Sequence, residues 1–372
     1  MKKITGTILA LTLVLTMTAP AFANTGIPIA TPNPTATTIT VTRLYGQNRY
    51  ETAIAIANDL IPVYNNGGQF DNIVLASGNN YPDALAGAPL AKVLKAPILL
   101  LDKTSSASTE TLNYVKAHLK PGGGVYILGG SGLFPTDYLQ SIETTLGIAP
   151  SQVTQIGGAD REATSLMIAQ KVVQLGGNTT NQVILVSANN FYDALTGAPR
   201  AAYMDIPMLL VSPNGFSPEQ KAFVDPISFP LTIGDITKQL NTFYPRAAQN
   251  YEYAGANEYE TNATFDDFFS ADAPYAYVAT GEDYPDALAG AVLAGASQST
   301  AGNIWLVQPN TLPSVTSTHL NDAAYYEHRY YAPNTTNLII PNLVVFGGSG
   351  AVSDSVVQQV QAIIQSTGKA IQ

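Results

Sequence analysis

The chain has 372 residues, of which 46% are hydrophobic and 12% are charged, and its formal net charge is −10. This length is enough for two or three packed domains, and the acidic balance argues against a nucleic-acid ligand, which needs a basic surface. Cysteine is absent, which excludes disulfides and thiolate metal sites and fits an exported bacterial protein better than a secreted animal domain.

The N-terminus has the features of a secretory signal peptide. Lys2 and Lys3 precede a short apolar segment at 8–15, and Ala21-Phe22-Ala23 is a small-x-small cleavage signal. We predict a signal peptide over 1–23; the alternative of a retained anchor is disfavoured because the apolar segment is too short to span a bilayer. Cleavage removes two of the 17 Lys and Arg residues and takes the net charge to −12. Residues 24–40 are rich in Thr and Pro and predict a flexible lead-in.

From residue 39 onward the hydrophobic pattern alternates between strand and helix periodicity. The expected strands are 39–44, 72–77, 96–101 and 125–128, and the expected helices begin at Arg49, at Ser105 and at Thr136. The segment 96–101 is continuously apolar, as expected for a strand that is buried on both faces. This alternation predicts an α/β fold in which helices cover a parallel sheet.

One stretch of this pattern occurs three times, at 73–89, 183–199 and 276–291. Each copy has an apolar run, a short polar turn and then Asp-Ala-Leu-x-Gly-Ala. The motif aspartates Asp83, Asp193 and Asp286 are separated by domain-sized intervals that are too long for a solenoid repeat. We therefore predict three related modules over 41–150, 151–248 and 249–372, with an insertion in the third near 309–341.

The copies differ at positions that bear on function. Tyr192 replaces Pro82 in the second module, and Glu258 stands in the third module where Arg49 and Arg161 stand in the others. The insertion is rich in tyrosine, and its rings either stack on sugars or cap an edge of the fold. If ligand contacts use these positions, three equal binding sites are not expected.

Four segments of the first module carry a family resemblance: 43–53, 77–91, 96–101 and 125–130. Together with their second and third copies they resemble the cell-wall-binding repeat family of Gram-positive surface proteins, best known from clostridia, over nearly all of 40–366. The resemblance implies three tandem small parallel-sheet modules of Rossmann- or Toprim-like type, packed around a pseudo-threefold axis. It also implies a secreted protein at the cell wall or cell surface that binds an anionic cell-wall glycopolymer non-covalently.

The candidate polymer-binding residues lie in the repeated motifs. An arginine can bind a phosphate or a carboxylate through two hydrogen bonds, although a structural pair with a carboxylate of a neighbouring module is the alternative. The motif aspartates lack the second carboxylate that a glycosidase needs, and a role at the positive end of a helix is the alternative. The candidates are Arg49, Tyr81, Asp83, Arg161, Asp193, Tyr284 and Asp286.

The resemblance also points to an anchoring motif in the third strand of each module. In this chain it corresponds to Pro97, Ile98, Leu99, Leu100, Pro207, Met208, Leu209 and Leu210. These residues have the pattern of buried strands, so truncating them is expected to damage the core first.

Other chemistry has weaker signals. The turns 129–132 and 347–350 either offer backbone N–H groups to a phosphate or are simply tight glycine turns. The histidines His118, His319 and His328 do not match a zinc-ligand spacing. We predict no metal, no cofactor and no catalytic residue.

These observations favour a non-catalytic protein that docks on the cell wall, with other surface-layer proteins as further candidate partners. Two alternatives stay open at this point. One is a wall-modifying hydrolase that uses the insertion of the third module, and the other is an adhesin or scaffold whose partner is another surface protein.

Overall fold

The computed structural model describes residues 39–64, 67–80, 84–234, 236–244, 252–269, 275–296, 302–330 and 342–369. The predicted signal peptide and most of the predicted lead-in lie outside these ranges. So do Tyr81 and Asp83, as do the tyrosine side chains of the predicted insertion.

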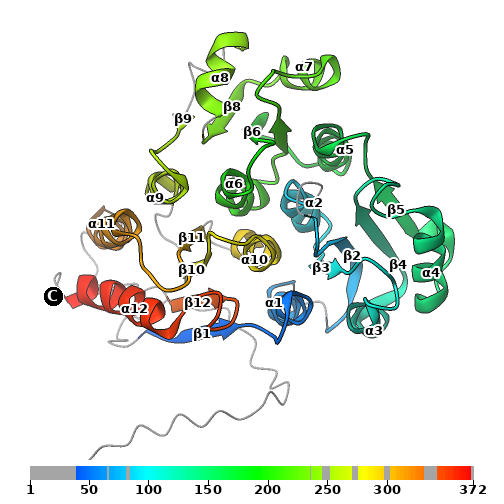
Figure 1. The fold of residues 1–372 in the computed structure, drawn as a ribbon, viewed down its shortest axis with the longest axis horizontal. Coiled ribbons are helices and arrows are strands. Elements are labelled where there is room, and N and C mark those ends of the chain that lie inside the picture. Colours follow the sequence, from blue (N-terminus) through cyan, green and yellow to red (C-terminus); the bar gives the residue numbers. More distant parts are fainter. Residues whose placement is uncertain are drawn as a thin grey trace, which may run out of the picture.

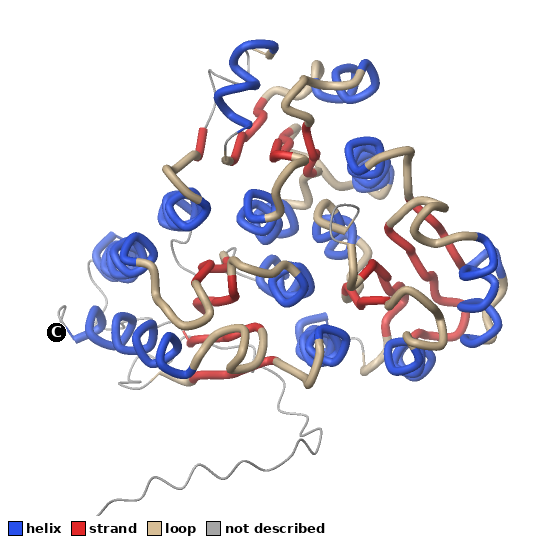
Figure 2. Tube along the Cα trace, viewed as in Figure 1, coloured by secondary structure: helices blue, strands red, loops and turns tan. Residues whose placement is uncertain are grey.

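The described strands form three parallel sheets of four strands each (Figure 2). Their orders correspond strand by strand, which confirms the prediction of three repeated α/β units. The first sheet has the order β3 (Ile98–Leu101), β2 (Phe70–Ser77), β4 (Leu119–Leu128) and β5 (Val153–Ile156). The second has the order β7 (Met208–Val211), β6 (Gln182–Ser187), β8 (Phe229–Ile233) and β9 (Glu252–Tyr253). The third has the order β11 (Ile304–Val307), β10 (Tyr275–Thr280), β12 (Asn342–Phe346) and β1 (Val41–Leu44).

The described helices also fall into equivalent sets. The inner ones are α1 (Arg49–Tyr64), α5 (Arg161–Gln174) and α9 (Glu258–Phe269), together with α2 (Gly87–Val93), α6 (Tyr192–Tyr203) and α10 (Pro285–Ala296). The outer ones are α3 (Thr109–His118), α7 (Pro218–Val224) and α11 (Ser314–Tyr330), together with α4 (Thr136–Leu146), α8 (Ile236–Phe243) and α12 (Asp354–Lys369). A short 3-10 helix, η1 (Pro150–Gln152), precedes β5. The start of the predicted insertion thus contains α11, which takes the place of α3 and α7.

The sheets and the sequence repeats are out of phase by one strand. The opening strand of the second repeat, β5, pairs with β4 of the first, and β9 of the third repeat pairs with β8 of the second. The opening strand of the first repeat, β1, pairs with β12 at the far end of the chain, with Val41 opposite Leu343 and Leu44 opposite Phe346. Figure 1 shows this closure, with blue β1 lying beside red β12. Each repeat therefore completes the sheet of its neighbour, and the three form a closed ring.

The centre of the ring is made by the helices that carry the repeated motif. Helices α2, α6 and α10 all contact one another, and around them α1 packs on α10, α5 on α2 and α9 on α6 (Figure 1). Their sequences are dominated by small and aliphatic residues, which allows backbones to approach closely. At Gly295 of α10, for example, an added Cβ would lie 2.6 Å from Ala202 Cβ of α6.

The glycine of each motif has a common structural role. Gly87, Gly197 and Gly290 each face the central part of their own sheet, where an added Cβ would lie 2.4 Å from Leu128, 2.8 Å from Ile233 and 2.4 Å from Phe346. These three contacts are on the equivalent strands β4, β8 and β12. The invariant spacing of the motif glycine within this chain therefore follows from the close packing of one helix on one strand.

Candidate binding surface at the repeat junctions

Each inner helix of the first set begins at a junction between two repeats. In the first two repeats the first helical residue is an arginine whose Nη1 donates to the carbonyl that follows the central strand. Arg49 donates to Gly78 O at 2.6 Å, and Arg161 donates to Ala188 O at 2.7 Å. In the third repeat this helical position is held by Glu258. Two of the three junctions therefore carry an arginine at the same place.

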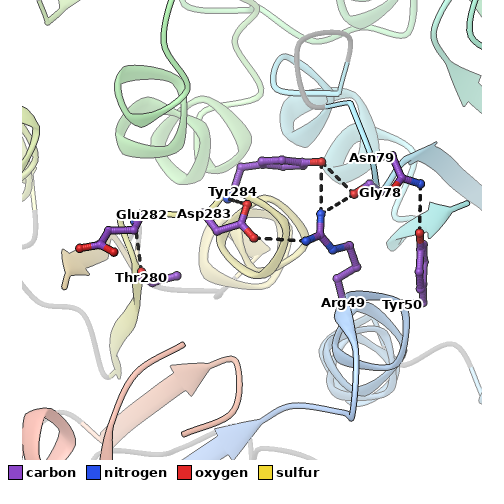
Figure 3. Close-up of polar contacts among 8 residues, drawn as sticks. All are labelled: Arg49, Tyr50, Gly78, Asn79, Thr280, Glu282, Asp283 and Tyr284. Carbon is purple, nitrogen blue, oxygen red and sulfur yellow. Dashed lines mark hydrogen bonds and ion pairs between the residues drawn. The ribbon is translucent and has the colours of Figure 1, made fainter. Parts of the chain in front are cut away.

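The junction between the first and third repeats brings four groups together (Figure 3). Arg49 Nη2 pairs with Asp283 Oδ2 at 3.3 Å, and the guanidinium carbon lies 5.8 Å from the centre of the Tyr284 ring. The Tyr284 hydroxyl donates to Gly78 O at 2.8 Å. Arg49 thus makes the structural pair with a neighbouring carboxylate that was one of its two predicted roles.

This junction is also open to solvent. The side chains of Arg49 and Asp283 are 35% and 51% exposed, respectively. An exposed ion pair is worth little in water, so a better-placed anion can displace Asp283 from the guanidinium at small cost. The same arginine can therefore serve both the junction and an external anionic group.

Aromatic residues of the motif turns meet near the centre of the ring. Tyr284 and Phe191 occupy equivalent positions in the third and second repeats, and their ring centroids are 6.2 Å apart in an edge-on arrangement. Phe191 was not among the predicted residues. The signal that could have found it is its alignment with Tyr81 and Tyr284 in the three copies of the motif.

Two of the motif aspartates, Asp193 and Asp286, lie in first helical turns, as the helix-end interpretation predicted, and Asp83 is outside the described residues. Asp193 of α6 is only 3% exposed, and its Oδ2 accepts a hydrogen bond from Asn190 Nδ2 at 2.9 Å. Asp286 of α10 is next to Gly347, where an added Cβ would lie 2.3 Å from its Oδ2. Gly234 has the same relation to Asp193. These carboxylates are packed against the glycine turn that ends the sheet and are poorly placed to reach a polymer.

Burial also changes the ionisation of Asp286. Its pKa is raised to about 6, mainly because burial penalises the charged form and also because Asp283 is nearby, while Arg49 and a hydrogen bond from Thr52 act in the opposite direction. The Thr52 contact crosses from α1 of the first repeat to α10 of the third. It therefore links two repeats through a partly buried hydrogen bond.

The threonine at this position recurs in every repeat and was missed by the sequence reasoning. Thr52, Thr164 and Thr261 each accept a hydrogen bond at Oγ1 from a glycine N–H six residues earlier, at 3.1, 3.0 and 2.9 Å. The recurring Gly-x5-Thr spacing was the available signal. These hydrogen bonds fix the turn that directs each inner helix into its junction.

In each glycine turn at a sheet end, the amide of the first glycine is occupied. Gly129 N donates to Ile156 O at 2.8 Å, Gly234 N to Tyr253 O at 2.7 Å and Gly347 N to Leu44 O at 2.9 Å. All three glycines have positive φ values of 137°, 79° and 98°, which side-chain-bearing residues rarely adopt. The geometry of these amides thus corresponds to a tight turn that pairs with the neighbouring repeat.

The residues of the predicted anchoring motif are buried. Ile98, Leu99 and Leu100 form β3, and Met208, Leu209 and Leu210 lie in β7. Pro97 O and Pro207 O accept hydrogen bonds from Val74 N and Ile184 N, each at 3.0 Å. A polymer on the surface cannot touch these side chains, so any effect on anchoring would act through the fold.

A polar network follows the strand ends of the first repeat. Asn79 Nδ2 donates to Asp102 Oδ1 at 2.8 Å and to the Tyr50 hydroxyl at 3.2 Å. The pKa of Asp102 is lowered, first by the backbone hydrogen bond from Lys103. This anionic group is close to the Arg49 junction and restricts where a negatively charged ligand can bind.

His118 has structural surroundings. His118 stacks on Tyr114 with a centroid distance of 4.1 Å, and its Nδ1 lies 2.8 Å from Gly68 O. Within the described ranges no group of three His, Cys, Asp or Glu side chains could hold a metal ion. No helix in those ranges is both long and apolar enough to cross a membrane.

Comparison with known proteins identifies the repeats. The family described as Cell wall binding domain 2 (CWB2) matches residues 43–138, 155–234 and 252–357. Two solved structures share the fold. Cwp8 from Clostridium difficile has a TM-score of 0.73 and 23% identity, and the match covers 88% of this chain and 52% of that chain. Cwp6 from the same organism has a TM-score of 0.71 and 22% identity, and the match covers 89% of this chain and 48% of that chain.

Two curated relatives match in sequence. N-acetylmuramoyl-L-alanine amidase LytC of Bacillus subtilis is 27% identical over 68% of this chain and 48% of its own length. The Amidase enhancer of Bacillus subtilis is 26% identical over 77% of this chain and 37% of its own length. The chain thus spans less than half the length of these relatives.

Proposed function

Because the chain belongs to the Cell wall binding domain 2 family, we propose that it anchors non-covalently to the bacterial cell wall by binding an anionic secondary wall polymer. In this proposal the protein is exported, loses residues 1–23, and acts at the cell surface without catalysing a reaction. Other surface-layer proteins are candidate partners there.

The observation that carries the proposal is the repeated arginine at the junctions. Arg49 and Arg161 are held in equivalent places by equivalent carbonyls, and among the described residues the carboxylate that pairs with Arg49 is the exposed Asp283, which an external anion can replace. A phosphate or carboxylate accepts two parallel hydrogen bonds from a guanidinium. Because the arginines lie in one ring, a single polymer chain can reach more than one of them, and weak contacts then multiply.

The charge distribution limits this binding to local positions. The chain is acidic overall, with 27 Asp and Glu against 17 Lys and Arg, and Glu258 occupies the third junction. We therefore expect two arginine junctions to hold the polymer and the Glu258 junction to contribute little. Affinity for the polymer should fall as salt rises, because exposed charges are screened.

A pull-down with purified sacculi tests the proposal. The unmodified protein should sediment with native sacculi and stay in solution with sacculi whose secondary polymers have been removed by acid. The double variant Arg49→Gln, Arg161→Gln should bind at least about tenfold more weakly, since each lost charge-assisted contact is worth roughly 1.5–3 kcal/mol. Lys221→Gln is the matched control, because Lys221 of the outer helix α7 pairs with Asp225, the residue that follows the helix. Unchanged binding to stripped sacculi would sink the polymer proposal.

The amidase relatives give one reason to test for catalysis as well. LytC carries an enzyme name, although the chain matches less than half of it. A zymogram on purified wall discriminates the two functions, because a wall hydrolase clears the substrate and a binding protein does not.

A further inference from the structure

One of the three junctions is held only by non-covalent contacts. The first repeat leads directly into the second and the second into the third, whereas the first and third meet only by ring closure. That closure includes the β1–β12 pairing, the Arg43–Asp354 pair at 2.9 Å, the Arg49 contacts and the packing of α1, α2 and β3 on α10. Anything that weakens this packing can open the ring without breaking the chain.

A buried carboxyl group lies within this packing. Thr52 and Asp59 are seven residues apart on α1, which is about two helical turns, so both side chains lie on the same face. Thr52 hydrogen-bonds Asp286 of α10, which shows that this face is directed at the third repeat. Asp59 is 6% exposed, and its Oδ2 accepts no hydrogen bond from any described residue.

The surroundings of Asp59 offer little to stabilise a negative charge. After Asp286, helix α10 consists only of Ala, Leu, Gly and Val, and β3 consists of Ile and Leu. Among the described residues no ion pair involves Asp59. The elements that pack on α1 carry these titratable or charged groups: Asp286 of α10, Glu110, Tyr114, Lys116 and His118 of α3, and Arg43 of β1. Strand β10 adds Tyr275 and Tyr277.

Arg43 and Tyr114 are engaged elsewhere, Lys116 is exposed, and the acidic groups and Tyr277 do not favour the charge. Arg43 donates to Gly347 O and Val352 O at 2.9 Å and pairs with Asp354. The Tyr114 hydroxyl donates to Asn58, the neighbour of Asp59. The pKa of the buried Tyr277 is raised by burial and also by the charges of Tyr275 and Asp59.

Ionisation of Asp59 is therefore coupled to the packing of α1. Burial raises the pKa of Asp59 to about 7, whereas an exposed Asp ionises near 4. A group with a raised pKa in the packed state stabilises that state fully at low pH, and the stabilisation is lost as the pH rises through the raised value. The sensitive window is therefore between about pH 4 and pH 7, and above it the buried charge favours separation of α1 from α10.

We propose that the α1–α10 junction is a pH-responsive latch, which closes the ring while Asp59 is neutral and loosens when Asp59 ionises against the apolar face of α10. The junctions between consecutive repeats are bridged by the chain itself. They are therefore expected to stay closed over the same range. If a wall polymer spans the latch, opening also weakens its binding, a consequence that rests on the proposed function.

The absence of cysteine makes the latch measurable with site-specific spin labels. Lys103→Cys with Gln358→Cys places labels on exposed positions of the first and third repeats, and Lys103→Cys with Gln170→Cys places them on the first and second. Distances are measured without wall material, so the result does not depend on polymer binding. Between pH 5 and pH 8 the first pair should gain a longer, broader population, with an open-to-closed ratio that rises by up to about tenfold for each pH unit. The second pair should not change.

Variants decide whether Asp59 is responsible. Asp286 of the same junction also ionises below Asp59, at about pH 6, so the double variant Asp59→Asn, Asp286→Asn should abolish the response of the first pair, and Asp286→Asn alone should keep the part centred near pH 7. Asp137→Asn, on the exposed first turn of α4, should leave the response intact. A response above pH 6 that is as large in Asp59→Asn as in the unmodified chain, or equal responses of both label pairs, would overturn the latch. If Asp59→Asn does not fold, the two label pairs in the otherwise unmodified chain still decide, since no change between pH 5 and pH 8 also overturns it.

Discussion

The motif glycines provide the strictest test of how the repeats pack. In Gly290→Ala the new methyl group would lie 2.4 Å from two ring atoms of Phe346, which is fully buried and stacks on Tyr277 at a centroid distance of 5.5 Å. Overpacking of this kind costs about 1–3 kcal/mol, whereas replacing glycine by alanine within a helix gains up to about 1 kcal/mol. We expect Gly290→Ala to lower the free energy of unfolding by about 1–2 kcal/mol.

The equivalent substitutions should differ in a defined order. In Gly87→Ala the nearest atom is the terminal Cδ1 of Leu128, and rotation of that side chain can relieve the contact. In Gly197→Ala two isoleucine side chains, of Ile233 and Ile184, are within 3.1 Å. We therefore expect Gly87→Ala to be nearly neutral and Gly197→Ala to lie between it and Gly290→Ala.

Urea unfolding followed by circular dichroism measures this series. Gly132→Ala is the control, because an added Cβ there meets nothing within 4 Å and its φ is not positive. If Gly290→Ala were as stable as Gly132→Ala, the close packing of α10 on β12 would not be the reason for the motif glycine, and the reasoning would be wrong.

Two further predictions concern buried polar groups of the third repeat. The pKa of Asp286 is raised from 3.8 to about 6, so its ionisation lowers the free energy of unfolding by about 3 kcal/mol as the pH rises from 4 to 7. Asp286→Asn should remove this part of the pH dependence of urea unfolding. An unchanged pH profile would contradict the prediction. Asn262 is fully buried; its side chain accepts a hydrogen bond from Leu306 N at 2.8 Å and donates one to Ile304 O at 2.9 Å. Asn262→Ala should lower the free energy of unfolding by about 2–5 kcal/mol, because it leaves two buried backbone groups unpaired. Asn262→Ser should cost less in the same measurement, because Ser165 makes the equivalent bond to Leu210 N at 3.0 Å; an equal loss in both variants would argue against this hydrogen bond as the cause.

Much of the local structure could be predicted from the sequence. The apolar run at 96–101 contains β3, and the helices expected to begin at Arg49 and Thr136 are α1 and α4, which begin at those residues. These predictions succeeded because buried parallel strands and amphipathic helices leave a strong periodic signal. The helix expected to begin at Ser105 begins instead at Thr109, since hydrogen bonds among Thr104, Ser106 and Ser108 hold that segment in turns.

The site was less predictable than the elements. The repeated arginine was identified, but its carbonyl partner and its pair with Asp283 depend on which repeats become neighbours in space. The motif aspartate was a candidate because it is a polar residue in a recurring turn. Its packing against a glycine of positive φ could not be read from the sequence, because that glycine lies at the end of a different strand.

Ring closure is the feature that local patterns could not specify. A four-residue strand such as β1 has the same hydrophobic pattern whether it pairs with its own repeat or with β12. What selects β12 is the repetition itself: β5 and β9 each complete the preceding sheet, so the first repeat has an opening strand without a predecessor and the third sheet has a free edge. Joining these two satisfies the backbone groups of both. The number of repeats, the junction arginines and the buried Asp59 are therefore parts of one arrangement, because ring closure places the first inner helix, which carries Arg49 and Asp59, against the third repeat.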